Sequence, residues 1–599
     1  MLWKLSLTGI KGRLRDYIVL FSGLMLSSAI FYMFESLATN EAFLQSNSPI
    51  SATTMVFQVG SVLLGIITLF YIFYANSFLM AMRQKDYGMF MMLGAKGRKI
   101  GQMIFIETFF VGLLATVLGL GLGIGLTTVV NNLLVSNLEL AISHYSPFSL
   151  KAIVISLIFY AALFLLAAMV NARKIVKQPI LKILRSNETP HHLKSKKIIL
   201  GVEVISGIAL LAAGYWFMTQ LETMQVAAIF IAMGTILVGS YLMFHSVVIF
   251  VLSLLKKSDA VIFKKLTNFT LSQLSFRIRD YTKMLALIAV LFALALGAST
   301  AGLGFRNEIP AMTDRTSAYD LILIQPSSSE QADVEELQPT LNQTYHYKTD
   351  DTHVYIVKEE YDQKPVIEIP IESFKGELKY EEHNGDDLVA DKIKRNAVRE
   401  LLFAENQTKE MVVLSETEFN QQAGESQSVQ VVQVADFMEQ KQAIKDLVLS
   451  NEENNQVDAI TGSYAQKYNA YVNFNSIFSG FEFMGFFLGI AFLTMLASCL
   501  MFKILSGAHS DVRRYEMLNK IGTRTELLKQ SIRREIGVLF ALPAMLGTVH
   551  VLFGLQMFKL FMQDPYAGIW IPFAIFFVLY FAYYVLTTWI YTNIVLKKD

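Results

Sequence analysis

Ten long, mostly apolar stretches constrain this chain more than any other feature of its sequence. A helix needs about 20 apolar residues to cross the roughly 30 Å hydrocarbon core of a bilayer, and in a helix every backbone polar group is paired internally. Of all residues, 53% are hydrophobic and only 17% are charged. We therefore predict an α-helical integral membrane protein with ten transmembrane helices, near residues 17–38, 55–81, 104–134, 150–170, 198–220, 226–255, 284–305, 476–506, 536–558 and 570–592.

Charge divides the loops into two classes. Residues 306–475 contain 15 Lys and Arg against 32 Asp and Glu, whereas the rest of the chain contains 36 against 18. Most of these 36 basic residues lie in the two end segments and in the loops at 82–103, 171–197, 256–283 and 507–534. Because loops rich in Lys and Arg stay in the cytoplasm, we predict that both termini are cytoplasmic and that residues 306–475 are extracellular.

The chain repeats itself. The sequence RLRDY at 13–17 recurs as RIRDY at 277–281, an offset of 264 residues. A second set recurs at an offset of 428 residues: Tyr87, Met89, Gly94, Gln102, Glu107 and Gly119 match Tyr515, Met517, Gly522, Gln530, Glu535 and Gly547. Such duplication predicts two four-helix units in the same orientation, spans 1–4 and 7–10, joined by a helix pair without a counterpart.

These boundaries predict five segments. They are 1–197 (spans 1–4), 198–270 (the helix pair, spans 5 and 6), 271–305 (span 7), 306–475 (the acidic domain) and 476–599 (spans 8–10). In the acidic domain, apolar or alternating runs at 320–325, 353–358, 366–371 and 429–434 predict strands, and helical periodicity covers 387–404 and 436–449. We expect one large mixed α/β domain between helices 7 and 8. The lone Cys499 excludes a disulfide within the chain.

The repeated cytoplasmic segment is the main candidate for function. Residues 83–94 (RQKDYGMFMMLG) place polar and basic side chains before an apolar stretch and a glycine, a pattern typical of a short helix at the membrane interface. One copy could simply rest on lipid headgroups. Two copies in the same register favour a pair of docking handles for a dimeric partner. No glycine stands five residues before Gly-Lys-Ser or Gly-Lys-Thr, so the sequence has no P-loop for ATP.

The segment at 83–95, Arg-x-Lys-x-Tyr-Gly-Met-x-x-x-Leu-Gly-Ala, resembles the FtsX-like permeases of ATP-binding-cassette (ABC) systems. Ten spans with one outside domain between spans 7 and 8 resemble, within that family, the bacitracin-resistance type of peptide-antibiotic permease of Gram-positive bacteria. The second copy differs, with Glu516 in place of Gly88. Docking residues expected from the resemblance and the repeat are Arg83, Lys85, Tyr87, Gly88, Met89, Gly94, Arg513, Arg514, Tyr515, Met517 and Gly522.

The resemblance implies a non-catalytic subunit in a bacterial cell membrane. It implies two copies of a separate ABC ATP-binding subunit, which would hold ATP and Mg²⁺, while this chain carries no cofactor, metal or catalytic residue. It also implies a sensor histidine kinase as a partner, and a peptide antibiotic or its lipid-linked target as a ligand. Motion of the ATPases would pass mechanically to the outside domain. Membrane lipids are expected partners, and nucleic acid is not.

Several carboxylates lie within the predicted spans, where an ionisable group is costly and is either functional or paired. Glu107 and Glu535, which are repeat mates, are predicted to pair with basic residues. Glu35 and Glu482 lie toward the outer ends of spans 1 and 8 and could face a lateral groove for a lipid headgroup or peptide. Span 3 also carries Gly112, Gly119, Gly121, Gly123 and Gly125, a spacing that allows neighbouring helices to approach closely.

Three other functions remain open on the sequence. An ion-coupled secondary transporter also uses repeats and buried carboxylates. An FtsX-like permease could act on lipids or lipoproteins instead of antibiotics. A sensing or scaffolding protein could bind a ligand through the acidic domain while the spans do no work.

Overall fold

The computed structural model describes residues 14–39, 48–138, 146–176, 197–257, 266–370, 373, 377–455 and 466–596. Contacts divide the chain into two compact units. The first contains Met1–Ser46, Thr53–Gly304 and Gly480–Asp599, and the second contains Asn47–Ala52 and Phe305–Ser479. Each unit is described separately below.

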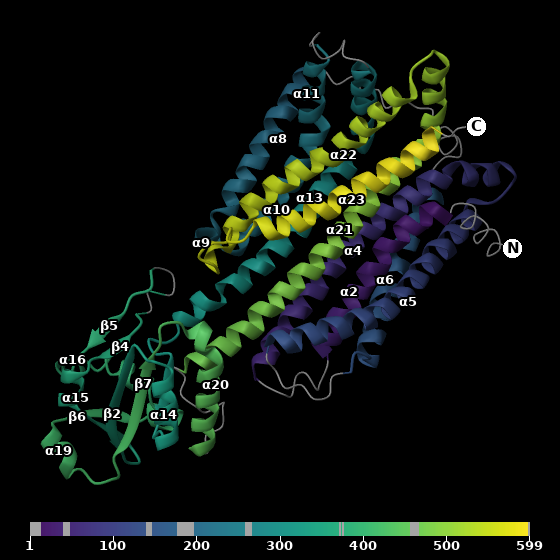
Figure 1. Ribbon diagram of the computed structural model, residues 1–599. Helices are drawn as coiled ribbons and strands as arrows, with labels where there is room; N and C mark the ends of the chain where they lie inside the picture. The colour runs from purple at the N-terminus through teal and green to yellow at the C-terminus, as the bar shows by residue number, and fades with distance from the viewer. Residues whose placement is uncertain are drawn as a thin grey trace. The chain divides into compact units, whose positions relative to one another are not determined.

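The prediction of ten membrane-spanning helices is confirmed for the described residues, which contain ten helical stretches of sufficient length and apolar character. The helices that form them are shown in Figure 1. They are α2 (Leu14–Thr39), α4 (Ser48–Met92), α5 (Gly97–Leu138), α6 (Leu150–Val176), α8 (Lys197–Met218), α10 (Val226–Leu242) continued by α11 (Val248–Leu255), α13 (Thr267–Asp314), α21 (Lys467–Lys520), α22 (Thr525–Gly554) and α23 (Trp570–Val595).

Within the first unit, spans 1–4 and spans 7–10 form the two four-helix repeats, and these make equivalent helix contacts. A Cβ atom added to Gly119 of α5 would lie 2.5 Å from the carbonyl oxygen of Met25 in α2. One added to Gly547 of α22 would lie 2.9 Å from the carbonyl oxygen of Ala289 in α13. Gly119 and Gly547 are repeat mates at the offset of 428, and Met25 and Ala289 are mates at the offset of 264. Span 3 therefore crosses span 1 at the same place where span 9 crosses span 7.

We expect Gly119→Leu and Gly547→Leu to destabilise the protein by about 1–3 kcal/mol or more, because the added side chain would overlap a neighbouring helix backbone. The loss of folded protein on heating, followed by size-exclusion chromatography in detergent, measures the effect. Gly121→Leu is the matched control in the same helix, since no atom lies within 4 Å of a Cβ at Gly121. Equal losses in Gly119→Leu and Gly121→Leu would contradict the close crossing.

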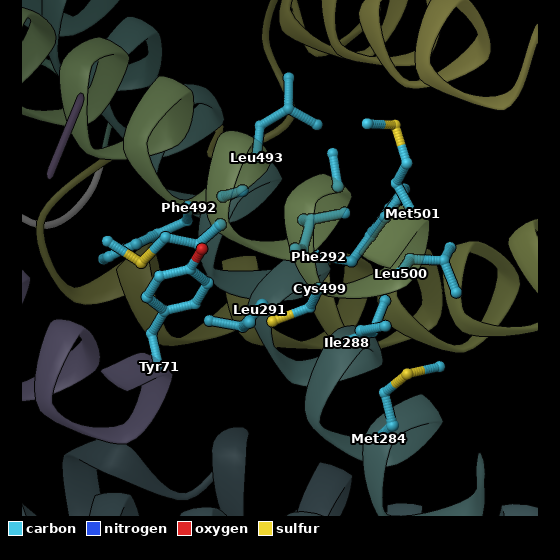
Figure 2. Close-up of a cluster of buried hydrophobic side chains, with 14 of the residues drawn as sticks. Tyr71, Met284, Ile288, Leu291, Phe292, Phe492, Leu493, Cys499, Leu500 and Met501 are labelled. Carbon is cyan, nitrogen blue, oxygen red and sulfur yellow. The ribbon is translucent and has the colours of Figure 1, made fainter. Parts of the chain in front are cut away.

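The two four-helix units meet through α4 and α21. The Tyr71 hydroxyl lies 3.0 Å from Ser498 Oγ. The repeat mate of Tyr71 at the offset of 428 is Cys499, which directly follows Ser498. Equivalent parts of α4 and α21 therefore face each other. Figure 2 shows Tyr71 reaching into a buried cluster that includes Leu291 of α13 and Phe492 of α21.

The helix pair α8 and α10 is attached to α22 through a buried histidine. His550 Nδ1 lies 2.8 Å from the Tyr215 hydroxyl and its Nε2 lies 2.9 Å from Ser240 Oγ. The Tyr215 ring also stacks on Phe553 at 4.2 Å. Both ring nitrogens are thus occupied, which satisfies the polar side chain within a span and fixes the pair against the second repeat.

The second unit is built on a five-stranded sheet. Its order is β1-β7-β2-β3-β6, and all neighbours are antiparallel except β3 and β6. The strands are β1 (Leu321–Ile324), β2 (Leu341–Thr349), β3 (His353–Val357), β6 (Glu410–Leu414) and β7 (Gln427–Gln433). A separate pair joins β4 (Val366–Glu368) to β5 (Glu381–His383).

Both faces of this sheet are buried at β1 and β7, whereas β2 exposes Asn342 and His346 on one face. Ile322, Tyr345 and Val431 belong to a core on one face. Leu323 and Val432 belong to a second core on the other face, which also contains side chains from α14 (Ser328–Glu336) and α20 (Phe437–Asn454) and from the ends of α13 and α21. Alternate residues of β1 and β7 therefore enter different cores.

The predicted elements of this unit are mostly present. The runs at 320–325, 353–358 and 429–434 form β1, β3 and β7, and the helix predicted at 436–449 is α20. The run at 366–371 is shorter, since β4 ends at Glu368 before Pro370, which has no N–H for a ladder; residues 371 and 372 lie outside the described part.

The single helix predicted at 387–404 is wrong. It is broken into α16 (Gly385–Ala390) and α17 (Asn396–Arg399), and α18 begins at Ala404. Between α16 and α17, Arg395 Nε donates to the Leu388 carbonyl at 2.7 Å, and its Nη1 donates to the Met411 carbonyl at 2.9 Å. The first bond satisfies a carbonyl that a continuous helix would have paired, and the second attaches the break between the helices to strand β6.

A buried ion pair fixes the ends of the two long helices within the second unit. Lys467 Nζ lies 2.7 Å from Asp320 and 2.8 Å from Asp314, and Asp320 also accepts the Val434 N–H at 2.7 Å. Lys467 and Asp320 are both buried. The start of α21, the end of α13 and strand β1 are thereby joined around one cation.

We expect Lys467→Met to lower the stability of the second unit by about 3–5 kcal/mol, because it leaves the Asp320 carboxylate buried without its cation. Limited proteolysis of the full chain between residues 306 and 475 measures this loss. Lys392→Met is the control: Lys392 pairs with Glu410 at 3.2 Å on the surface of the same unit, where an ion pair contributes at most about 1 kcal/mol. Equal protease resistance in both variants would contradict the structural role of Lys467.

Candidate functional site

The repeated cytoplasmic segments end two of the longest helices rather than forming separate ones. The prediction of a short independent helix at 83–94 is wrong, since α4 runs unbroken to Met92 and α21 runs unbroken to Lys520. Each membrane-spanning helix therefore continues without a break into the candidate docking segment.

Both helices end in the same hydrogen-bonded motif. The Ala95 N–H donates to the Phe90 carbonyl at 2.9 Å and the Thr523 N–H donates to the Leu518 carbonyl at 3.1 Å. Gly94 and Gly522 adopt φ of +95° and +93°. A glycine at positive φ with this bonding pattern is a Schellman C-cap, which explains why the repeat retains glycine at both positions.

Each end presents exposed apolar side chains. Met89 and Leu93 are 49% and 79% exposed, and their repeat mates Met517 and Ile521 are 61% and 76% exposed. We call residues 89–94 the first tip and residues 517–522 the second tip. Met92 adds a third exposed apolar side chain to the first tip, where the second has Lys520. In Figure 1 the two tips lie at the same end of the helix bundle, at the upper right.

Tyr87 and Tyr515, although central to the sequence motif, do not contribute to this surface. Each is only 2% exposed. Tyr87 packs in a small core with Ile100 and Ile104 of α5, and the Tyr515 hydroxyl donates to Glu535 at 3.4 Å. The tyrosines hold each helix end against the following helix and thus position the tips.

Buried ion pairs reinforce each hairpin. In the first, Arg83 pairs with Glu107 of α5, and both side chains are buried. In the second, Glu535 lies 2.6 Å from Arg277 Nε, and the arginine comes from α13 instead of from α21. The predicted pairing of Glu107 and Glu535 with basic residues is confirmed. Because a buried charge is costly unless paired, these contacts fix the relative positions of the helices they join.

Arg277 and Asp511 were missed by the sequence reasoning as parts of this network. Arg277 Nη2 lies 2.5 Å from Asp511 Oδ2 and 2.5 Å from the Tyr591 hydroxyl of α23. Asp511 is the repeat mate of Arg83, so the second copy has a carboxylate where the first has the cation. This reversal of charge at matched positions is a sequence signal that could have indicated that Glu535 does not pair in the way that Glu107 does.

The other predicted site residues are distributed around the tips. Arg513 is exposed, and Arg514 Nη1 donates to Gln273 of α13 at 3.0 Å and lies 3.1 Å from Asp511. Gly88 is buried. The Lys85 side chain lies outside the described part of the chain.

Glu35 and Glu482 are both half-buried. The backbone of Glu482 packs against Gly302 of α13, where an added Cβ would lie 3.1 Å from the Glu482 carbonyl oxygen. The lateral groove assigned to these carboxylates stays a prediction.

Part of this region matches a known protein family. Residues 58–180 match the FtsX-like permease C-terminal family, and this stretch contains the first tip and the Arg83–Glu107 pair. With ten apolar helices, the chain is a multi-pass membrane protein that carries an FtsX-like permease domain.

The chain is also similar to individual permeases of known name. The chain is 25% identical over 303 residues to the bacitracin export permease protein BceB of Bacillus subtilis, covering 49% of this chain and 47% of the relative. It is 24% identical over 302 residues to BceB of Halalkalibacterium halodurans, covering 49% and 46%. It is also 22% identical to the ABC transporter permease protein YxdM of B. subtilis, over 82% of each chain. The matches to the two BceB proteins thus span about half the length of each relative.

Proposed function

We propose that this chain is the membrane subunit of an ABC transporter that protects a bacterium from peptide antibiotics, and that its two tips bind a pair of separate ATPases. The observation that carries this proposal is the matched pair of exposed apolar tips. Met89 and Leu93 have the same register, cap and exposure as Met517 and Ile521. A dimeric partner with two equivalent pockets needs two such surfaces on one chain.

The tips have the chemistry of an interface core. Exposed apolar side chains that cluster at the end of a rigid element mark protein contacts, and methionine is enriched in interface cores. Each tip is supported from behind by a buried tyrosine and a buried ion pair, so contact with a partner requires little ordering of the tip. An ion-coupled transporter has no use for such a pair of surfaces.

Motion would reach the second unit through two helices. α13 has 48 residues and α21 has 54, and each contributes residues to both units. Because α21 ends in the second tip, a displacement of that tip by an ATPase would be transmitted along a single continuous helix. This mechanical coupling is the step at which ATP hydrolysis, with ATP and Mg²⁺ held by the partner, would change the second unit.

The second unit would meet the antibiotic. Its excess of acidic residues would attract a cationic peptide and speed the encounter. The names of the two BceB relatives refer to bacitracin export. The proposal therefore places residues 306–475 outside the cell and both termini in the cytoplasm. Reporting of drug load to a sensor kinase is a further part of it.

Resistance tests the proposal directly. A strain that lacks the gene should become more sensitive to bacitracin or to a linear cationic peptide, and the wild-type chain should restore growth only when the partner ATPase retains its catalytic residues. Restored growth with an inactive ATPase that is abolished by a proton ionophore would indicate ion coupling instead. Unchanged antibiotic sensitivity together with altered lipoprotein release would favour the lipid or lipoprotein alternative.

A further inference from the structure

The first unit contains a cavity that the proposed function does not use. Its volume is about 490 Å³, and it lies between α13, α22 and α23. It is open to the surface and its lining is mostly apolar, with Leu271 and Leu274 of α13, Val538 of α22 and Tyr584 of α23 among its residues, while Thr267 and Thr270 of α13 add two hydroxyls. The Tyr584 hydroxyl donates to the Arg533 carbonyl at 3.1 Å, which fixes α23 against α22 at this point.

Two adjacent cations border these apolar walls. Arg533 and Arg534 both line the cavity and are exposed, and neither forms an ion pair with a carboxylate in the part of the chain that the structure describes. Arg277, one helix away, is by contrast buried and paired with two carboxylates. Two guanidinium groups beside an apolar cavity suit a ligand that has both an anionic group and a hydrocarbon chain.

These arginines have no counterpart in the first copy of the repeat. At the offset of 428, Arg533 and Arg534 correspond to Phe105 and Ile106 of α5. The first copy thus uses apolar side chains at the same helical positions, next to the same buried glutamate, Glu107. The basic residues of the first copy lie instead in its loop at 82–103, so arginines at these two helical positions, beside the cavity, are found in the second copy alone.

We propose that this cavity binds a monoanionic phospholipid of the surrounding bilayer, with its phosphate between Arg533 and Arg534 and an acyl chain along Leu271, Leu274 and Val538. A bilayer lipid is favoured over a soluble anion because the lining beyond the arginines is mostly apolar, and apolar surface contributes nothing to the binding of a free phosphate. The site is independent of the tips and of the antibiotic.

Native mass spectrometry of the full chain in detergent tests this site with phosphatidylglycerol and phosphatidylcholine as probes. Arg533→Gln/Arg534→Gln should weaken phosphatidylglycerol binding at least about tenfold, since two charge-assisted contacts to the phosphate are lost. Binding of phosphatidylcholine should change much less. Arg513→Gln/Arg524→Gln is the matched control, because it removes two exposed arginines that do not line the cavity.

Gly537→Leu supplies a second test that leaves the charges in place. The nearest atom to a Cβ at Gly537 is the Tyr584 hydroxyl oxygen at 3.6 Å, so a side chain is tolerated there and would fill the cavity. We expect this variant to lose phosphatidylglycerol while remaining folded. Unchanged binding in both cavity variants, an equal loss in the Arg513/Arg524 control, or displacement of the lipid by inorganic phosphate would each overturn the proposal.

Discussion

Placing a carboxylate on both tips should separate this chain from the ATPase that we propose as its partner. In Met89→Glu/Met517→Glu, each new carboxylate would be buried in an interface without a cation. This costs at least about 3 kcal/mol and corresponds to a loss of about 100-fold or more in affinity. Both methionines are exposed in the chain itself, so folding and insertion should be unaffected. The ratio of ATPase to permease after affinity purification measures the effect.

The single variants and a control sharpen this result. Met89→Glu should cause the larger loss of the two, because the first tip also presents Met92, whereas the second presents Lys520, whose cation could pair with the new carboxylate. Ile393→Glu puts the same charge on an apolar residue of the second unit that is 74% exposed, and it should leave the ATPase bound. If the double variant retains the ATPase at wild-type levels, the tips are not the surfaces that bind it.

Replacing Arg277 by methionine should strongly destabilise the first unit. Asp511 and Glu535 would then be buried without their shared cation, at a cost of about 3–5 kcal/mol. The same change also removes the hydrogen bond from Arg277 to Tyr591, so α13, α21, α22 and α23 would lose the contact at which they converge. We expect a lower unfolding temperature in detergent, measured by fluorescence-detected size-exclusion chromatography.

Two further variants separate this cause from the loss of one positive charge. Arg279→Met removes an exposed arginine two residues along the same helix and should behave like the wild type. Adding Asp511→Asn and Glu535→Gln to Arg277→Met should recover part of the lost stability, because neutral amides cost less to bury than carboxylates. If Arg277→Met unfolds at the same temperature as Arg279→Met, the network is not a structural centre.

Hydrophobic periodicity and the internal repeat predicted those elements that are determined by their own local sequence. The ten spans follow from runs of apolar residues, and Gly94 and Gly522 mark the helix ends because a Schellman cap needs a residue that tolerates positive φ. The strands β1, β3 and β7 follow from apolar runs of strand length. The exposed Met89 and Met517 were predicted as members of the docking segments, and their function remains to be tested.

Features that depend on distant residues could not be predicted in this way. Strand β2 was missed because its sequence, LNQTYHYKT, is largely polar, yet it lies at the centre of the sheet. Its Lys348 is buried because Nζ donates to the carbonyls of Phe419 and Gln422, at 3.0 and 2.8 Å. No local sequence pattern indicates these partners, which lie more than 70 residues further along the chain.

The docking segments show the same limit. Sequence matching gave Tyr87 and Tyr515 the same importance as Met89 and Met517, since all four recur at one offset. Only the packing separates the buried tyrosines, which hold the helix ends, from the exposed methionines, which remain available for a partner. Recurrence in the sequence identifies the positions that both copies retain. Burial then shows whether such a residue packs inside the protein or is available for a partner.

The most direct test of the account is affinity purification of this chain from its native membrane, followed by mass spectrometry and an assay of ATP hydrolysis. We expect an ABC ATPase to copurify at two copies per chain, and its hydrolysis rate to change when bacitracin or another peptide antibiotic is added. Purification of the folded chain without any ATPase, under conditions that preserve other membrane complexes, would contradict it.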